Sequence, residues 1–434
     1  MTSRRCMNTK CKAILLFFII VLGAPVETRA YVDAVPDFIV SGELRDGQVS
    51  ALRSVEIDKM LASGINWYVG IPRVDNEKAR NLFLQAAKLG SPKAKMWLAR
   101  SYFKGRMGFS RDVAKGEKLA KKNLASVKLL AKKGDVQAMF LLASLYHEGL
   151  VVPQDYSKAV SWYRKGTDKG DFIATGNIGG LYNYGHGVEK DHSKALRLYK
   201  KSANEGNTFS MMAVAGMYQN GEGVVQNNST AVTWYKKAAE RDNTIVMATL
   251  GYMYIDGYGV PKNHNSAMEW YKKAAALGYA FAMNRIGAMY MYGVGVDKNY
   301  SIALEWFNKA AEKGDSSAMN SIGVMYMDGT GVDKNYVTAM EWYKKAAELS
   351  YPLAMVNIGN MFNKGMGVEQ SYSTALEWYQ KAAELGSHSA MGWLGYMYEF
   401  GHGVAKSRVK AIQWYMKGDA LGNEYSKKAL KRLE

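Results

Sequence analysis

The stretch that decides the fold is MYMYGVGVDKNYSIALEWFNKAAEKGD, from Met289 to Asp315. Its aromatic pair Trp306-Phe307 recurs at intervals of 36 residues over eight successive registers without a gap. A fixed period of this kind indicates a repeat architecture, in which copies of one unit stack on each other. The equivalent pairs are Trp162-Tyr163, Leu198-Tyr199, Trp234-Tyr235, Trp270-Tyr271, Trp342-Tyr343, Trp378-Tyr379 and Trp414-Tyr415.

The second half of each unit is predicted to be an amphipathic helix. Ala303, Phe307 and Ala310 fall at helical spacing, so they form one apolar stripe that can pack on neighbours. A glycine such as Gly314 is suited to ending this helix, because it adopts a left-handed conformation at little cost. Before each second helix stands a residue whose side chain can accept a free backbone N–H in the first turn. These residues are Asp155, Asp191, Asn227, Asn263, Asn299, Asn335, Ser371 and Ser407.

The first half of each unit is also predicted to be a helix, as in AMNRIGAMYMYG, where Ala282, Ile286 and Met289 share one face. Gly287 lies in the middle of this helix, where glycine costs about 1 kcal/mol relative to alanine. The glycine nevertheless recurs, so we expect the two helices to approach too closely for a side chain. The equivalent residues are Gly179, Gly251, Gly323, Gly359 and Gly395.

The repeat divides the chain into segments. Residues 135–422 are predicted to form eight regular units, and residues 423–434 a charged helix that closes the stack. Residues 31–75 lack the pattern and are expected to form an extended lead and a capping helix.

Residues 76–134 follow the pattern imperfectly. The spacing from Gly90 to Gly134 is 44 residues, eight more than the period. We therefore expect divergent repeats here, with an insertion between about Arg106 and Gly116.

Residues 1–30 have the layout of a secretory signal peptide. Basic residues precede an apolar run from Ala13 to Leu22, and small and polar residues follow as far as Ala30, where cleavage is expected. Ten apolar residues are too few to span a bilayer core of ~30 Å as a helix. Cys6 and Cys11 would leave with the signal, so no disulfide would remain. We expect a periplasmic or secreted protein without stable membrane insertion.

The chain is strongly basic. It carries 57 lysines and arginines against 39 acidic residues, a net charge of +18 that falls to +14 once residues 1–30 are left out. This charge favours a partner with an acidic surface. Exported proteins rarely meet nucleic acid, so we predict a protein partner. An anionic membrane surface or polysaccharide is the alternative that charge alone suggests.

The motif A-M-x-x-I/L-G-x-M-Y-x-x-G-x-G-V followed by A-x-x-W-Y-x-K-A-A-E-x-G stands almost whole at Ala282 to Gly314 and at Ala318 to Leu349. It resembles the Sel-1-like repeat (SLR), a relative of the tetratricopeptide repeat, over about residues 76–434. The resemblance implies an all-α fold, an α/α solenoid of about nine 36-residue helix-turn-helix repeats. It further implies a right-handed superhelix whose first helices line a concave face. Members of that family usually act as adaptors in protein assemblies and generally have no catalytic residues.

The turn Gly293-Val294-Gly295 could be taken for a phosphate loop, because backbone N–H groups in such turns bind anions. The same pair of glycines recurs in six other units, and no basic P-loop ending follows it. We interpret the turn as the hinge between paired helices. One unit departs from this pattern, with Val151 in place of the second glycine.

Acidic and basic residues on the second helices are interpreted as a solvated outer face. They are spaced as i,i+4 pairs in the favourable order, each worth ~0.3 kcal/mol. The pairs are Glu269–Lys273, Glu305–Lys309, Glu341–Lys345 and Glu377–Lys381.

No catalytic, cofactor-binding or metal-binding residue is predicted. The six histidines form no metal-binding pattern, although His186 and His192 could lie near each other, and no G-x-S-x-G elbow occurs. A cell-wall or β-lactam hydrolase would need a non-repeated nucleophile and base, and residues 31–75 contain neither histidine nor cysteine.

Specificity is expected at first-helix positions that vary between units, because packing does not fix them. Asparagine can bond a partner's backbone through both its donor and its acceptor, and aromatic residues anchor interfaces. The predicted partner-binding residues are Asn177, Tyr184, Asn284, Arg285, Asn320, Asn357 and Trp393.

The sequence thus predicts an exported, non-enzymatic scaffold or adaptor that binds a partner protein along its concave face. A periplasmic immunity protein that neutralises a contact-delivered, lipase-type toxin of type VI secretion is the alternative role. The partner's identity and the oligomeric state stay open.

Overall fold

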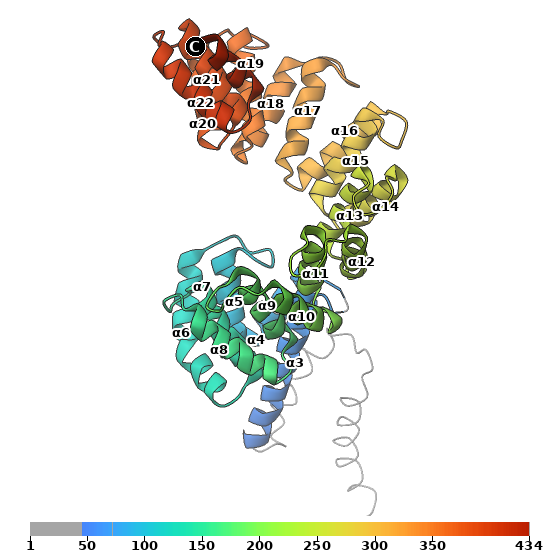
Figure 1. Ribbon diagram of the computed structural model, residues 1–434, viewed down its shortest axis with the longest axis vertical. Helices are drawn as coiled ribbons and strands as arrows, with labels where there is room; N and C mark the ends of the chain where they lie inside the picture. Colours follow the sequence, from blue (N-terminus) through green and yellow to red (C-terminus); the bar gives the residue numbers. More distant parts are fainter. Residues whose placement is uncertain (1–45, 72, 434) are drawn as a thin grey trace, which may run out of the picture.

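The computed structural model describes residues 46–71 and 73–433, which form 21 helices and no strand (Figure 1). Consecutive helices pack in pairs, and the pairs follow one another along a curved rod. The predicted all-α solenoid is thereby confirmed. The predicted signal peptide and the beginning of the lead segment lie outside the described residues.

Each repeat consists of a first helix, with an odd number in Figure 1, and a second helix with the next even number. The first helices are α3 (Asp46–Val69), α5 (Pro92–Lys104), α7 (Val136–Glu148), α9 (Phe172–Tyr184), α11 (Thr208–Asn220), α13 (Thr244–Asp256), α15 (Ala280–Tyr292), α17 (Ser316–Asp328), α19 (Pro352–Lys364) and α21 (His388–Phe400). The second helices are α4 (Asn76–Lys88), α6 (Val113–Lys132), α8 (Tyr156–Asp168), α10 (His192–Asn204), α12 (Asn228–Ala239), α14 (His264–Ala276), α16 (Tyr300–Glu312), α18 (Tyr336–Glu348), α20 (Tyr372–Glu384) and α22 (Arg408–Ala420), followed by α23 (Glu424–Leu433).

The predicted capping residues set where the second helices begin. All eight side chains accept a backbone N–H from the first turn of the helix that follows. Asn299, for example, accepts from Ile302 at 3.0 Å. Such a contact stabilises a helix by about 1 kcal/mol. At the other end Gly278 and Gly314 have φ of 82° and 83°, which ends the helix as predicted.

The glycines in the middle of the first helices leave space for an aromatic ring from the second helix of the same repeat. A Cβ added to Gly323 would lie 2.6 Å from the Tyr343 ring, and one added to Gly359 would lie 2.5 Å from the Tyr379 ring. Real Cβ atoms essentially never come this close to another heavy atom. The predicted close approach of the two helices is confirmed, and each approach buries the tyrosine of the second helix.

The second glycine of each turn joins one repeat to the repeat before it. Gly187 has φ of 70°, and a Cβ there would lie 2.6 Å from the backbone of Tyr156, the first residue of α8. Gly403 meets Tyr372, the first residue of α20, in the same way. The turn is therefore a contact between repeats as well as a hinge. Val151 occupies this position with φ of 55°, a conformation that residues other than glycine rarely adopt.

The insertion in the divergent repeats lies mainly in α6. This helix has 20 residues, whereas α16 and most other second helices have 13. The turn before α6, residues 105–112, is only one residue longer than the turn at residues 293–299. The expectation of an insertion between Arg106 and Gly116 is thus corrected. The extra residues continue the helix by about two turns, because its buried stripe continues through Val127 and Ala131.

The N-terminal repeats form a closed coil. In Figure 1, α3 (blue) crosses this coil and ends near α11. Thr208 donates its hydroxyl to the Val69 carbonyl at 2.8 Å, and Arg241 donates to the Gly70 carbonyl at 2.9 Å. The Tyr68 ring lies 5.5 Å from Phe209 on α11. First helices far apart in the sequence thus face each other across the inside of the coil, whereas the contacts after α13 join neighbouring helices.

The last helix, α23, packs on the C-terminal end of the solenoid, where it is bound by the largely buried carboxylate of Glu399. Glu399 on α21 accepts the hydroxyl of Tyr415 and the guanidinium of Arg432, both at 2.8 Å. The predicted charged terminal helix is therefore anchored by an ion pair to the preceding repeat. An apolar groove of about 370 Å³ lies between α22 and α23, next to Met416 and Leu430.

The glycine contact yields a paired stability prediction. Replacing Gly359 by alanine should lower the free energy of unfolding by about 1–3 kcal/mol, because the Tyr379 ring must move. The matched control is Gly216 on α11, where an added Cβ meets no atom within 4 Å. Gly216→Ala should raise the free energy of unfolding by about 0.5–1 kcal/mol, since alanine favours the helix. Urea unfolding of both variants tests this, and equal shifts would contradict it.

Candidate functional site

Four of the predicted partner-binding residues occupy one structural position. Asn177, Arg285, Asn357 and Trp393 each stand 14 residues after the aromatic residue of the preceding second helix. The structure places this position beside that aromatic residue, between successive first helices. Trp393 stacks on Tyr379 with ring centroids 5.6 Å apart.

The residue at this position decides how much space remains above the tyrosine. Trp393 covers Tyr379 with its ring. Arg285 lies near Tyr271, whose pKa is raised by burial to about 12 while the positive charge of Arg285 acts in the opposite direction. The Arg285 guanidinium also lies 4.9 Å from the Phe281 ring. Asn357 is smaller, and an open groove remains beside it.

This groove lies between α17, α18 and α19 and has a volume of about 250 Å³. Tyr343 as a whole is only 2% exposed, but it lines this groove, and its hydroxyl makes no hydrogen bond to the described residues. The equivalent Tyr379 donates to Asn360 at 2.7 Å. The groove is lined by Asp328, Lys334, Tyr343, Asn357, Asn360 and Lys364, together with Tyr336 and two methionines. It therefore combines a free hydroxyl, two amides and a net positive rim.

Asn284 and Asn320 lie elsewhere, inside the stack of first helices. Asn284 is 2% exposed and donates to Asp315, the capping residue of α17, at 3.2 Å. Asn320 is 6% exposed and accepts from Asn357 at 2.9 Å. Both side chains connect one first helix to the next. Asn320 thereby holds Asn357, which lines the groove, and both buried asparagines offer little surface to a partner.

Tyr184 lies at the end of α9 and is 68% exposed. It stacks on His186 at 5.8 Å, and His186 stacks on Tyr156 at 4.5 Å. The second histidine considered from the sequence, His192, hydrogen-bonds to the Asn183 amide at 2.8 Å. These histidines therefore have partners that fix their orientation.

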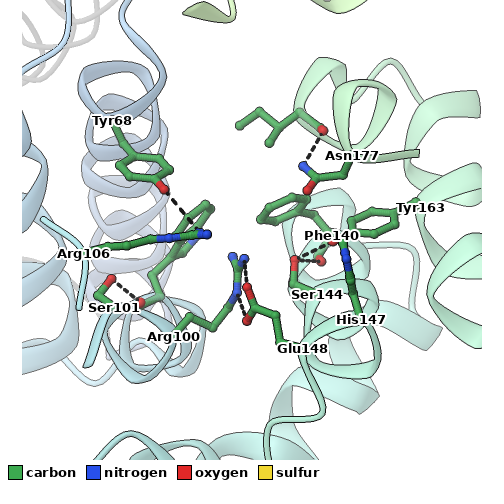
Figure 2. Close-up of polar contacts among 12 residues, drawn as sticks. Tyr68, Arg100, Ser101, Arg106, Phe140, Ser144, His147, Glu148, Tyr163 and Asn177 are labelled. Atoms are coloured by element: carbon green, nitrogen blue, oxygen red, sulfur yellow. Dashed lines mark hydrogen bonds and ion pairs between the residues drawn. The ribbon is translucent and has the colours of Figure 1, made fainter. Parts of the chain in front are cut away.

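A buried ion pair inside the N-terminal coil was not predicted. Figure 2 shows Arg100 from α5 and Glu148 from the end of α7 pointing toward each other. The guanidinium donates two hydrogen bonds to the carboxylate, at 2.9 and 3.0 Å, and the side chains are only 7% and 8% exposed. Trp97 and Phe140 both lie within 5.2 Å of the guanidinium carbon. Glu148 is the single acidic residue of the otherwise largely apolar helix α7, and this is the sequence signal that could have revealed the pair.

The ion pair controls the local protonation. Burial alone would raise the pKa of Glu148, but the adjacent Arg100 outweighs burial and holds that pKa below its ordinary value. Burial lowers the pKa of His147, the preceding residue. Beside the pair, Tyr163 shares a hydrogen bond of 3.0 Å with Ser144 (Figure 2). At neutral pH the pair is therefore ionised.

The predicted glutamate–lysine pairs on the second helices are wrong. No ion pair within 4.0 Å joins them in the part of the chain described. The lysines instead lie over the tryptophan three residues earlier, as Lys345 does over Trp342 at 4.1 Å. A cation over an indole ring is worth about 0.5–1 kcal/mol at an exposed site, which exceeds an exposed ion pair of this spacing. Lys273, Lys309 and Lys381 are placed in the same way.

Within residues 46–71 and 73–433, no group of three histidine, cysteine or acidic side chains could hold a metal ion. No helix of this part is long and apolar enough to cross a membrane. What the described surface offers is the groove between α17, α18 and α19 and a set of side chains that differ between repeats beside the buried aromatic residues.

The chain belongs to the Sel1 repeat family, as the resemblance predicted. The family model matches ten repeats, one more than expected from the sequence, because the end of α3 acts as a first helix. A Cβ added to Gly64 would lie 3.1 Å from the Phe83 ring of α4. Proteins of this family are typically non-enzymatic, protein-binding scaffolds. The matched residues are 60–91, 92–122, 136–171, 174–207, 208–243, 246–279, 280–315, 316–351, 352–387 and 388–418.

Several solved structures are similar to this chain. A Sel1 repeat protein from Oxalobacter formigenes is 28% identical, with a TM-score of 0.60 over 72% of this chain and 91% of that one. A protective antigen of uropathogenic Escherichia coli with an SLR fold is 27% identical, with a TM-score of 0.46 over 90% of both chains. An immunity protein from Pseudomonas aeruginosa is 22% identical, with a TM-score of 0.35 over 52% of this chain and 82% of that one. No curated protein is significantly similar in sequence.

The buried ion pair yields a prediction about pH. Glu148→Gln should lower the free energy of unfolding by about 3 kcal/mol at neutral pH, because it leaves Arg100 buried without a counter-charge. A folded-state pKa below the unfolded value stabilises the fold above the unfolded pKa, ~4.3 for glutamate, and this stabilisation is lost as the pH falls through the folded value. The difference between the two proteins should therefore be constant above about pH 5 and shrink below it.

Two controls accompany this measurement by urea unfolding. Asp155→Asn removes an exposed pair with Lys158 but keeps a capping side chain, so it should change little. Replacing Arg100 and Glu148 together by methionine should recover much of the loss, since both charges then disappear. A pH-independent effect of Glu148→Gln would contradict the assignment.

Proposed function

We propose that the chain is an exported, non-enzymatic scaffold that binds an acidic segment of a partner protein through its first helices, with the groove over Tyr343 as the anchor. The observation that carries the proposal is this groove, which Tyr343 lines from an otherwise buried position and where Lys334 and Lys364 outnumber Asp328. The Tyr343 hydroxyl makes no hydrogen bond to the described residues, so it can donate to and accept from a ligand that enters the groove.

The size and charge of the groove support a protein segment as its ligand. A volume of about 250 Å³ is below the roughly 300–1,000 Å³ of typical small-molecule sites. Asn357 and Asn360 can bond to a peptide backbone. The two lysines of the groove, Lys334 and Lys364, outnumber its one acidic residue, Asp328, so the net positive charge favours an acidic side chain of the partner. A segment that enters here can continue along neighbouring first helices, where Arg285 and Trp393 offer different contacts. Such differences between repeats would give specificity.

Filling the groove tests this proposal. Asn357→Trp should cover Tyr343 as Trp393 covers Tyr379, and it should weaken partner binding at least about tenfold while the fold is kept. The partner is obtained by affinity capture from the cell envelope and then purified, and its affinity is measured by calorimetry. Glu377→Trp, on the exposed face of the second helix α20, is the control and should bind normally.

Unchanged affinity of Asn357→Trp, with a normal unfolding midpoint, would exclude the groove as the anchor. The captured partner also separates the adaptor from the immunity role. A contact-delivered, lipase-type toxin among the tight binders would assign the chain to immunity. An assembly component of the same envelope would assign it as an adaptor.

Export is part of the same proposal and is tested separately. The layout of residues 1–30 supports cleavage after Ala30, so mass spectrometry of the chain recovered from the envelope fraction should find Tyr31 as its first residue. Leu16→Arg interrupts the apolar run and should leave the uncleaved chain in the cytoplasm. An uncleaved wild-type chain in the cytoplasm would overturn this part.

A further inference from the structure

The positive charge of the chain is concentrated in the divergent repeats. Residues 73–133 contain 17 lysines and arginines but only 4 acidic residues, a net charge of +13. Residues 134–434, which form the rest of the solenoid, contain 32 basic and 28 acidic residues, a net charge of only +4. The basic character that suggested an acidic partner is therefore mainly a property of one short region.

Within this region, the long helix α6 presents lysines on a single face. Its buried stripe comprises Gly116, Ala120, Asn123, Val127 and Ala131. At 100° per residue, the other lysines lie on the side opposite this stripe, whereas the ammonium of Lys115 lies over the Tyr102 ring of α5 at 4.0 Å. The lysines Lys115, Lys118, Lys121, Lys122 and Lys132 are exposed, as is Lys133, which follows the helix directly, and Lys128 is half-buried. We call these seven residues the α6 lysine face.

These lysines have no carboxylate partner within 4.0 Å among the described residues. Glu117 is the single acidic residue of α6. Lys118 and Lys122 are spaced i,i+4, as are Lys128 and Lys132, and each like-charged pair of this kind costs ~0.2–0.5 kcal/mol. An ordinary solvated helix alternates charges, as α16 does with Glu305, Lys309 and Glu312. The α6 lysine face is thus a repulsive arrangement that an anionic surface would relieve.

We propose that the α6 lysine face docks the solenoid onto an anionic phospholipid membrane. Lysine is a hydrated point charge without the fork that arginine offers for defined hydrogen bonds, and α6 contains no arginine. A surface of mobile headgroups needs charge rather than such geometry. From Lys118 to Lys132 the helix extends ~21 Å at 1.5 Å per residue, enough to cover several headgroups.

Two further features favour a membrane over a nucleic acid or an acidic protein. Leu129 lies on the exposed side of α6 and is 54% exposed, so it can enter the boundary between headgroups and acyl chains. No aromatic side chain lies on α6 to stack on bases. In Figure 1, α6 lies at the outer edge of the N-terminal coil, while the groove over Tyr343 belongs to the opposite arm. Membrane contact and partner binding can therefore occur together.

The test uses the full-length chain and vesicles of phosphatidylcholine with or without phosphatidylglycerol. Binding is expected only with phosphatidylglycerol and should fall as salt rises, since the Debye length shrinks from ~10 Å at 0.1 M to ~3 Å at 1 M. Replacing Lys118, Lys122 and Lys132 by glutamine should weaken vesicle binding by about 100-fold, at roughly fivefold per lysine. Arginine at the same three positions should keep the binding.

The matched control removes the same charge from another face. Lys273, Lys345 and Lys381 are exposed lysines on later second helices, and replacing them by glutamine should change vesicle binding less than about threefold. Equal losses in the two triple variants, or no vesicle binding at low salt, would overturn the proposal. It would also be overturned if the α6 variant lost binding to duplex DNA or polyglutamate but kept vesicle binding. Unfolding midpoints confirm that each variant is folded, and no partner protein is required.

Discussion

The structure depends on one steric contact that is made in six of the eight regular repeats, the meeting of a glycine with an aromatic ring. At Gly323 and Tyr343, as at Gly359 and Tyr379, the ring occupies the volume of a missing Cβ. The contact brings the two helices of a repeat close together and fixes the tyrosine in a buried position. The ring then forms the floor of the space between successive first helices, so the residue 14 positions later decides whether that space is filled or open. Packing and binding surface therefore have a common origin.

Most of the fold could be predicted because the same local sequence pattern recurs in successive repeats. The capping residues, the glycine after most second helices and the glycine within most first helices act over a few residues, so their consequences follow from spacing alone. The insertion was placed too early because helix α6 continues its apolar stripe for two further turns, which the turn pattern does not reveal. The closing contacts of Thr208 and Arg241 join residues more than 130 positions apart, and no periodic signal reports them.

The candidate site could be predicted only in part. Variation between repeats identified the position shared by Asn177, Arg285, Asn357 and Trp393, but it could not separate this position from the adjacent one, where Asn284 and Asn320 are buried. One residue along a helix turns the side chain by 100°, which is enough to move it from surface to interior. The lysines of the outer face lie over tryptophan rings because each lysine follows a tryptophan by three residues on the same helix. The prediction of glutamate–lysine pairs considered only the spacing of opposite charges and left this contact out.

The closed coil at one end and the open arm at the other give the molecule two kinds of mechanical response. In the arm, each repeat contacts mainly its neighbours. Small changes in the angle between repeats therefore add up along the arm, and the arm should bend easily. In the coil, bonds from Thr208 and Arg241 to the end of α3 connect the first and fifth repeats, so any such change must break them. The coil should therefore be the rigid part of the molecule. The arm, which carries the groove over Tyr343, should be the flexible part and can change its curvature when a partner binds.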